Sequence, residues 1–154
     1  MSEVLRRSSQ RDVVAALDVR GDCEVVLKRV RAPDRNAIRR LRSVEHAYAQ
    51  IDHPNVMQVV ELKQTRTDAW LVSKRVSGDD LLTWWRRLPL HATSRFEERW
   101  RYLAPVLTGL LDGLEAIHKA SLAHLDVKPA NILISGAGRP TLVGTGFAEP
   151  SDSP

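Results

Sequence analysis

An aspartate, a lysine and an asparagine lie close together in residues 124–131, which read HLDVKPAN. Because Asp126 and Asn131 precede the apolar run Ile132-Leu133-Ile134, both side chains can point into one cleft. The carboxylate of Asp126 can accept a proton from a hydroxyl nucleophile, and the amide oxygen of Asn131 can bind a Mg²⁺ ion that bridges phosphates. Lys128 can steady a transferred phosphate. Phosphoryl transfer depends mainly on positioning and charge neutralisation, so these residues are candidates for that chemistry.

Short strands and longer helices are expected to position these residues, which predicts an α+β fold. Runs of valine and other apolar residues between turn residues predict strands, and apolar residues three or four apart predict helices. Two strands, 12–18 and 23–30, are expected to pair as an antiparallel hairpin, and 132–135 and 141–143 as a second, short hairpin. Further strands are expected at 56–62 and 69–76. The expected helices are 34–51, one that opens at Asp79, and 95–119, which Pro105 should kink or divide.

Residues 124–131 resemble the catalytic loop of protein kinases, H-R-D-x-K-P-x-N, and the Lys-Pro pair is similar to its serine/threonine branch. Three further segments carry the resemblance. The sequence VVLK at 25–28 resembles the strand that bears the family's ATP-binding lysine, and HPNV at 53–56 resembles the turn after the family's helix αC. Residues 70–78 resemble the strand and hinge that hold adenine.

The resemblance implies a bilobal kinase-like fold with ATP and Mg²⁺ as cofactors. It places an N-lobe, a five-stranded antiparallel sheet with helix αC, at 1–76. A partial helical C-lobe follows at 77–148, then a disordered tail at 149–154. The chain ends soon after the position of the family's D-F-G motif, so it is expected to be a truncated domain.

The resemblance also implies roles for individual residues. Asp126 would be the catalytic base, Lys128 would contact the transferred phosphate, and Asn131 would bind the metal. Ser73 would close the back of the adenine pocket, and backbone groups of residues 74–76 would face the adenine edge. The residues implied to bind the nucleotide are Lys28, Val13, Val26, Lys74, Val76, Leu133 and Asn131.

The sequence departs from the family pattern at several positions. No glycine occurs at 5–10, where a glycine-rich loop would cover the phosphates. Val44 stands where a glutamate should pair with Lys28, and Glu45 is one residue away. Gly144 replaces the aspartate of D-F-G, which is the chief Mg²⁺ ligand. Val26, in place of a small alanine, narrows the adenine pocket, and Leu125 replaces the arginine of H-R-D.

Two classes of function therefore compete. One is an active serine/threonine kinase that uses Asp126 as base. The other, favoured by the departures, is a pseudokinase with a regulatory or binding role and weakened Mg²⁺ binding. A degraded fragment without function is a third reading. Each residue also has a simpler role: a strand lysine is often only solvated, Trp84 and Trp85 can pack in the core rather than stack on a ligand, and His118 and His124 can be packing residues.

Composition limits the partners. The net charge of +4 is mild and the arginine pairs are scattered, so neither a nucleic acid nor a membrane partner is expected. The single Cys23 suits a cytoplasmic protein, and no apolar run has the length of a membrane span. The expected partners are ATP and a protein substrate or regulatory protein. The apolar face of helix 95–119 should be covered by a partner, by a second copy in a homo-oligomer, or by segments that this sequence lacks.

Overall fold

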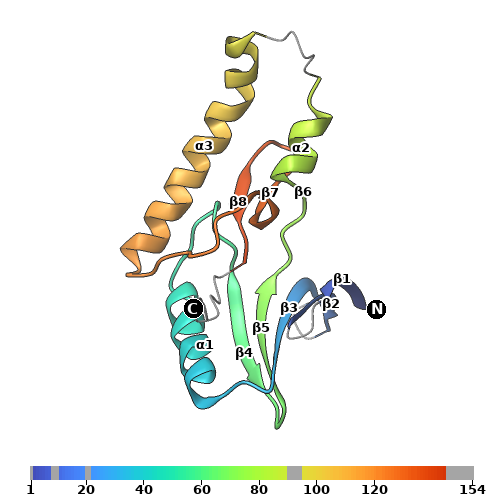
Figure 1. Ribbon diagram of the computed structural model, residues 1–154, viewed down its shortest axis with the longest axis vertical. Coiled ribbons are helices and arrows are strands. Elements are labelled where there is room, and N and C mark those ends of the chain that lie inside the picture. The colour runs from blue at the N-terminus through green and yellow to red at the C-terminus, as the bar shows by residue number, and fades with distance from the viewer. Residues whose placement is uncertain (1, 8–10, 20–21, 90–94, 145–154) are drawn as a thin grey trace, which may run out of the picture. The chain divides into compact units, whose positions relative to one another are not determined.

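The computed structural model describes residues 2–7, 11–19, 22–89 and 95–144 of the chain (Figure 1). It divides into two compact units. The first contains Met1–Asp52 and Gln58–Arg75, and the second contains His53–Met57 and Val76–Pro154. The expected disordered tail at 149–154 lies outside the described residues, as do positions 8–10 of the expected phosphate loop.

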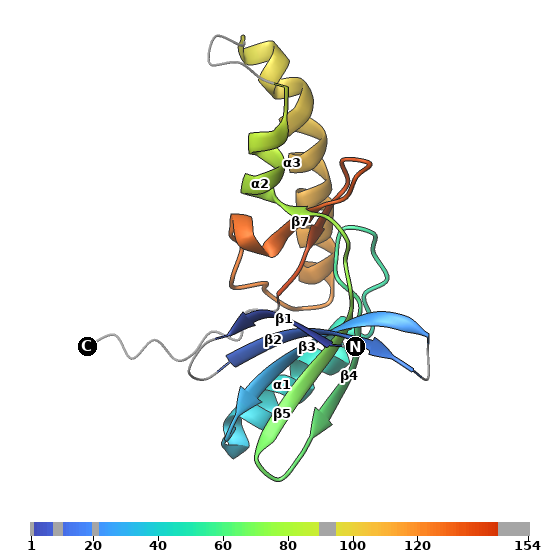
Figure 2. The same cartoon turned by 90° about the vertical axis from the view of Figure 1, so that its right-hand side faces the viewer.

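The first unit is built on a five-stranded antiparallel sheet with the strand order β1-β2-β3-β5-β4 (Figure 2). Its strands are β1 (Ser2–Arg7), β2 (Arg11–Asp18), β3 (Cys23–Arg31), β4 (Val59–Gln64) and β5 (Asp68–Lys74). The hairpin predicted from the valine-rich runs is confirmed, since β2 pairs with β3 along its whole length. The sequence pattern did not predict β1 as a strand.

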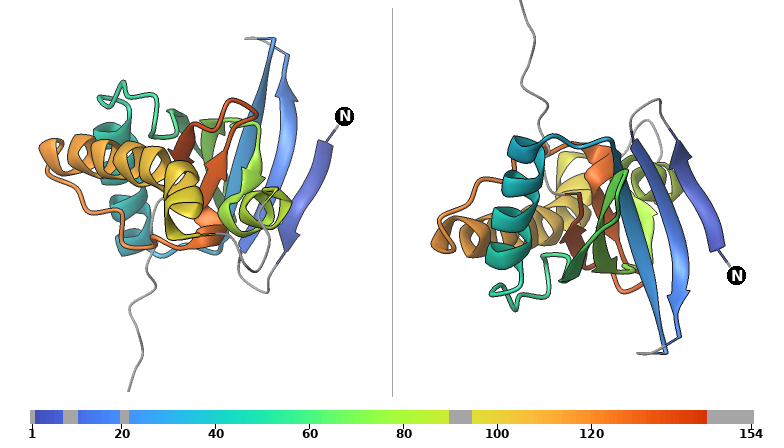
Figure 3. Two further views of the ribbon diagram at one scale, coloured as in Figure 1. Left: turned by 90° about the horizontal axis from the view of Figure 1, so that it is seen from above. Right: turned by 90° about the horizontal axis from the view of Figure 1, so that it is seen from below.

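Helix α1 (Arg35–Tyr48) covers the β4 and β5 side of this sheet, and β1 lies at the far edge (Figure 3). Asp34 begins the helix because its side chain accepts a hydrogen bond from the Ala37 N–H at 2.6 Å. Leu41 and Tyr48 of the predicted apolar stripe are buried, as are Ala69 and Leu71 of the sheet. The helix ends three residues before the predicted end at 51.

The second unit combines two helices with a three-stranded antiparallel sheet. The helices are α2 (Leu81–Arg87) and α3 (Phe96–Lys119), and a 3₁₀ turn, η1, spans Pro129–Asn131. The strands are β6 (Asp79–Asp80), β7 (Ile132–Ile134) and β8 (Pro140–Leu142). The predicted hairpin of β7 and β8 is confirmed. The two-residue strand β6 was not predicted, because two aspartates carry no strand signal.

Residues 53–57 explain why the strand predicted at 56–62 begins only at Val59. The Leu142 N–H donates to the Asn55 carbonyl at 2.8 Å, and the Met57 N–H donates to the Leu142 carbonyl at 2.9 Å. Val56 forms a parallel bridge with Leu142. These bonds hold the segment against β8 of the second unit, so its residues are not available to the ladder of β4.

Helix α3 is apolar on more than one side. Val106, Leu110, Gly113 and Ile117 are buried, and the helix packs on β8. Other apolar side chains are exposed: Phe96 70%, Trp100 46%, Leu107 42% and Leu111 66%. The rings of Phe96 and Trp100 stack with centroids 5.8 Å apart. The division expected at Pro105 is wrong, because α3 continues through this exposed proline as one helix.

An ion-pair network lies on one face of the first unit's sheet. Arg29 donates to both carboxylate oxygens of Asp68, at 3.0 and 2.9 Å, and its guanidinium lies 5.1 Å from the ring centre of Trp70. Arg31 donates to Asp12 at 2.7 Å. The hydrogen bonds from Arg29 and Thr67 hold the pKa of Asp68 below its usual value. This pairing links the middle strand β3 to β5.

The Asp68 pair predicts acid-sensitive stability. Since its pKa is lowered on folding, Asp68 stabilises the fold above the unfolded pKa of about 3.9, and this contribution is lost as the pH falls through the lower folded value. Asp68→Asn should lower the urea midpoint at pH 7, and its difference from wild type should shrink below about pH 4. Asp52→Asn is the control, because Asp52 is exposed. A difference that is unchanged by acid would contradict the role of the charge.

Candidate active site

The stretch 124–131 connects the end of α3 to β7 and closes with the turn η1. Pro129 suits the first position of that turn because its missing N–H would have no partner there. The Asn131 N–H donates to the Lys128 carbonyl at 2.8 Å, and the Asn131 carbonyl accepts from the Val143 N–H at 2.9 Å. The backbone of Asn131 is therefore held from both sides, by its own loop and by the residue after β8.

Asp126, Lys128 and Asn131 are brought together in the second unit. The Asn131 amide donates to the Asp126 carboxylate at 2.7 Å and to the Asp126 carbonyl at 2.9 Å. The Lys128 ammonium lies 2.7 Å from Oδ1 and 2.8 Å from Oδ2 of Asp126. The aspartate thus receives an ammonium and an amide donor, which orient its carboxylate.

The two residues before Asp126 fix its backbone. His124 is buried, and its Nδ1 accepts a long hydrogen bond of 3.4 Å from the Asp126 N–H. Leu125 has φ +60°, which is uncommon for a residue with a side chain, and its side chain is exposed. A buried histidine followed by a left-handed residue turns the chain so that Asp126 faces Asn131. Nothing in the leucine itself predicted this backbone conformation.

Gly144 lies directly against the Asn131 side chain. A Cβ at this position would be 3.1–3.2 Å from the three end atoms of the Asn131 amide, and Gly144 has φ +81°. Its N–H donates to Sδ of Met57 at 3.3 Å. The position where the resemblance expects an aspartate therefore leaves little space for a side chain. Met57 was missed from the sequence, because a methionine after a turn motif gives no signal of this contact.

The nucleotide-binding residues predicted in the first unit lie on its central strands. Lys28 is in register with Val13 of β2 and Leu71 of β5, and Val26 is in register with Ser73. Ser73 is buried, and its hydroxyl is 3.5 Å from the Val26 carbonyl. Val44 and Glu45 of α1 are both half-buried.

The predicted hinge at 74–76 already uses two of its backbone donors. The Lys74 N–H donates to the Gln58 carbonyl, and the Arg75 N–H donates to the Glu24 carbonyl, both at 2.9 Å. The backbone N–H expected to donate to adenine is therefore that of Val76. Val76 is the first residue of the second unit after the hinge strand. Leu133, in the middle of β7, is half-buried and in register with Asp80 and Thr141.

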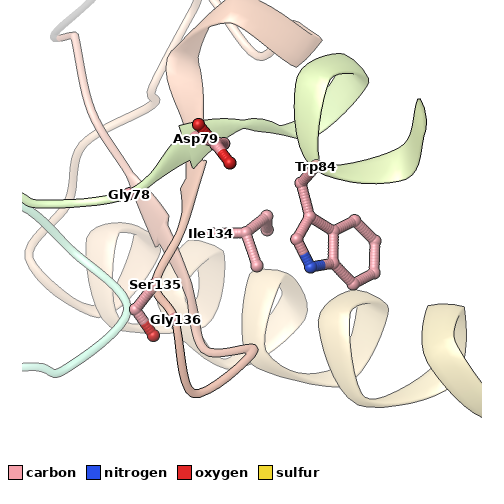
Figure 4. Close-up of a pocket in the computed structure, with 6 residues that line it drawn as sticks. All are labelled: Gly78, Asp79, Trp84, Ile134, Ser135 and Gly136. Atoms are coloured by element: carbon pink, nitrogen blue, oxygen red, sulfur yellow. The ribbon is translucent and has the colours of Figure 1, made fainter. Parts of the chain in front are cut away.

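A hollow of about 390 Å³ in the second unit is lined by Gly78, Asp79, Trp84, Ile134, Ser135 and Gly136 (Figure 4). The indole of Trp84 lies beside the side chain of Ile134. Asp79 accepts an ion-paired hydrogen bond from Arg87. None of the residues of the stretch 124–131 lines this hollow. Trp84 is half-buried here, as the packing alternative for this tryptophan requires.

Comparison with known proteins identifies a family match over most of the chain. The family model described as "Protein kinase domain" matches residues 9–153. CBL-interacting protein kinase 4 of Oryza sativa subsp. japonica is 34% identical over 122 residues, which cover 76% of this chain. Serine/threonine-protein kinase PkaB of Streptomyces coelicolor is 34% identical over 138 residues, or 84% of this chain. The probable serine/threonine-protein kinase PkwA of Thermomonospora curvata is 31% identical over 130 residues.

The matched segments span only a minor part of these relatives. They cover 24%, 30% and 16%, respectively, of the three proteins. Among the described residues, no helix is long and apolar enough to cross a membrane.

The contact between Gly144 and Asn131 predicts a sensitive position. Gly144→Ala should lower the free energy of unfolding by about 1 kcal/mol or more, since alanine resists positive φ and its Cβ meets the Asn131 amide. Urea unfolding measures this change. Gly138→Ala is the matched control, because Gly138 also has a positive φ of +78° and a Cβ there meets no atom within 4 Å. Equal effects of the two substitutions would show that the Asn131 contact does not constrain position 144.

Proposed function

Because this chain belongs to the protein kinase family, we propose that it is a nucleotide-binding pseudokinase of the serine/threonine type with a regulatory or binding role. The observation that carries the proposal is the cluster of Asp126, Lys128 and Asn131, bonded at 2.7–2.9 Å beside a glycine at position 144. The charged loop is retained, and the chief metal ligand is replaced. The proposed cofactor is ATP, as is general for the family.

The residues that the resemblance implies are proposed to contact the nucleotide. Lys28 would bind its phosphates, and Lys128 and Asn131 would face them from the loop. The adenine would contact the side chains of Val13, Val26 and Leu133. It would also contact the backbone of Lys74 and Val76. The support is the retained residue types at the family's motif positions and their placement on the central strands and beside η1.

Phosphotransfer is proposed to be strongly impaired rather than efficient. Gly144 supplies no carboxylate, so Mg²⁺ binding is weakened, and the loss of one electrostatic group typically costs about 10²–10³ in rate. The alternative is an active kinase in which Asp126 takes the proton of a protein hydroxyl as its oxygen attacks the γ-phosphate. The retained Asp126, paired with Lys128, supports testing this alternative.

The exposed stripe of α3 is proposed to bind a second copy of the chain. Phe96 and Trp100 are four residues apart, as are Leu107 and Leu111. Two antiparallel copies would therefore place Phe96 opposite Leu111 and Trp100 opposite Leu107 in both directions, which is the self-complementary pairing of a two-fold dimer. Burial of these side chains would supply the driving force. A cytoplasmic location is proposed from the single cysteine and the relation to serine/threonine kinases.

A thermal-shift titration tests nucleotide binding. ATP at millimolar concentration should raise the melting temperature of the wild type by mass action, and Lys28→Ala should abolish the rise. Lys63→Ala is the control, because Lys63 lies on edge strand β4 and pairs with Glu61. No shift for the wild type would mean that the chain does not bind ATP and would contradict the proposal.

The pseudokinase and kinase alternatives separate in a phosphorylation assay. With labelled ATP and a generic basic protein, the wild type should incorporate no more label than Asp126→Asn, which removes the proposed base. Incorporation by the wild type that Asp126→Asn stops would overturn the pseudokinase proposal. The thermal-shift result would then still stand as evidence of a nucleotide site.

Light scattering tests the proposed pairing through α3. The wild type should have the mass of a dimer, and Trp100→Glu should shift it to a monomer, because an exposed charge prevents burial of the stripe. Arg101→Glu, a change at the neighbouring exposed residue, is the matched control. A wild type that remains a compact monomer at all concentrations would exclude a second copy as the occupant of this face.

A further inference from the structure

We infer that the residues beside this loop do not fit Mg²⁺ and that the chain takes its nucleotide without the metal, with the ammonium group of Lys128 facing the phosphates. The inference rests on the proposed nucleotide binding and specifies its chemistry. It follows from the surroundings of Asn131, the residue implied to bind the metal, and of Gly144, which lies against it.

The carboxylate of Asp126 is already neutralised by its own loop. The Lys128 ammonium contacts both of its oxygens, at 2.7 and 2.8 Å, and the Asn131 amide contacts Oδ2 at 2.7 Å. Mg²⁺ sheds its hydration water reluctantly and demands near-octahedral oxygen ligands. To bind here it would have to displace an ammonium at ion-pair distance and an amide donor.

Asn131 is oriented toward Asp126 rather than toward a second ligand. Two hydrogen bonds from Nδ2 to Asp126 set the amide, and the backbone bonds to Lys128 and Val143 fix the residue that carries it. In the Asn131 amide, Oδ1 is then the atom that could bind a cation. Nδ2 cannot bind a metal while it donates both protons to Asp126.

Gly144 brings no carboxylate to the site. A side chain there would require a residue that tolerates φ +81° and would press on the Asn131 amide within 3.2 Å. In the part of the chain that the structure describes, no group of three or more histidines, cysteines, aspartates or glutamates is placed to hold a metal ion. Asn131 offers Mg²⁺ one amide oxygen and position 144 offers no side-chain oxygen, so these residues do not fit the carboxylate-containing ligand set that Mg²⁺ usually has beside phosphates.

The ammonium group of Lys128 can offset the negative charge of Asp126 in place of a metal ion. An ionised aspartate without a counter-cation would repel a triphosphate, and the repulsion between close charges is large in a poorly solvated site. Lys128 cancels the charge of Asp126, and its side chain is 45% exposed, so the ammonium can also meet a phosphate oxygen. A lysine binds phosphate as a point charge in this way.

Titration calorimetry of the whole chain with ATP, in EDTA and in excess Mg²⁺, tests the inference. The two dissociation constants should agree within about three-fold, and Lys128→Gln should weaken binding in EDTA roughly ten-fold, the value of a charged hydrogen bond. Lys119→Gln is the matched control, since Lys119 pairs with Glu115 at the same 2.7 Å on α3. Binding that Mg²⁺ strengthens more than about ten-fold would overturn the inference and leave nucleotide binding intact.

A second measurement does not depend on the nucleotide. Mn²⁺ substitutes for Mg²⁺ and broadens nuclear magnetic resonance signals near its site, so the Asn131 side-chain amide signal of the wild type should remain sharp in Mn²⁺. Selective broadening of this signal would overturn the inference. No ATP binding in either buffer, with a sharp Asn131 signal, would instead overturn the proposed function and the nucleotide part of the inference with it.

Discussion

The side-chain amide of Asn131 is the contact on which the loop depends. It joins the carboxylate and the carbonyl of Asp126, while its backbone joins η1 to the residue after β8. Because one residue holds both ends of the loop, its contacts orient Asp126. A conformation this constrained is preorganised for binding, since little freedom remains to be lost when a phosphate arrives.

The same contact explains the role of Gly144. Residue 144 follows the Val143 N–H that donates to Asn131, so it must pass close to the amide. A glycine fits there, whereas the Cβ of an aspartate in the same backbone conformation would lie 3.1–3.2 Å from the Asn131 amide. The loss of the metal ligand and the closed arrangement of Asp126, Lys128 and Asn131 are therefore two aspects of one geometry. The protein kinase family supplies the frame, and this chain carries a glycine beside Asn131 in it.

Strand β8 organises the rest of the second unit in a comparable way. Leu142 is almost completely buried, pairs with β7, and exchanges backbone hydrogen bonds with Asn55 and Met57. Gly109 and Gly113 of α3 allow the close approach of Pro140, Asn55 and Leu142, because a Cβ at either glycine would fall within 3.2 Å of them. The apolar side chains on another side of α3 find no such partner among the described residues, which motivates the proposed pairing of two copies.

The sequence by itself determined the family, the α+β class, the antiparallel hairpin of β2 and β3, and the loop that carries Asp126, Lys128 and Asn131. These follow from local signals: alternating valines, the Asp34 helix start, and a motif whose residues are neighbours in the chain. Local signals could not give strands β1 and β6, the later start of β4, or the unbroken course of α3 through Pro105. Those were decided by strand pairing, by the bonds of Asn55 and Met57 to β8, and by the exposure of Pro105. The left-handed Leu125 and the contact of Gly144 with Asn131 also belong to the tertiary structure, because they depend on atoms brought together from distant parts of the chain.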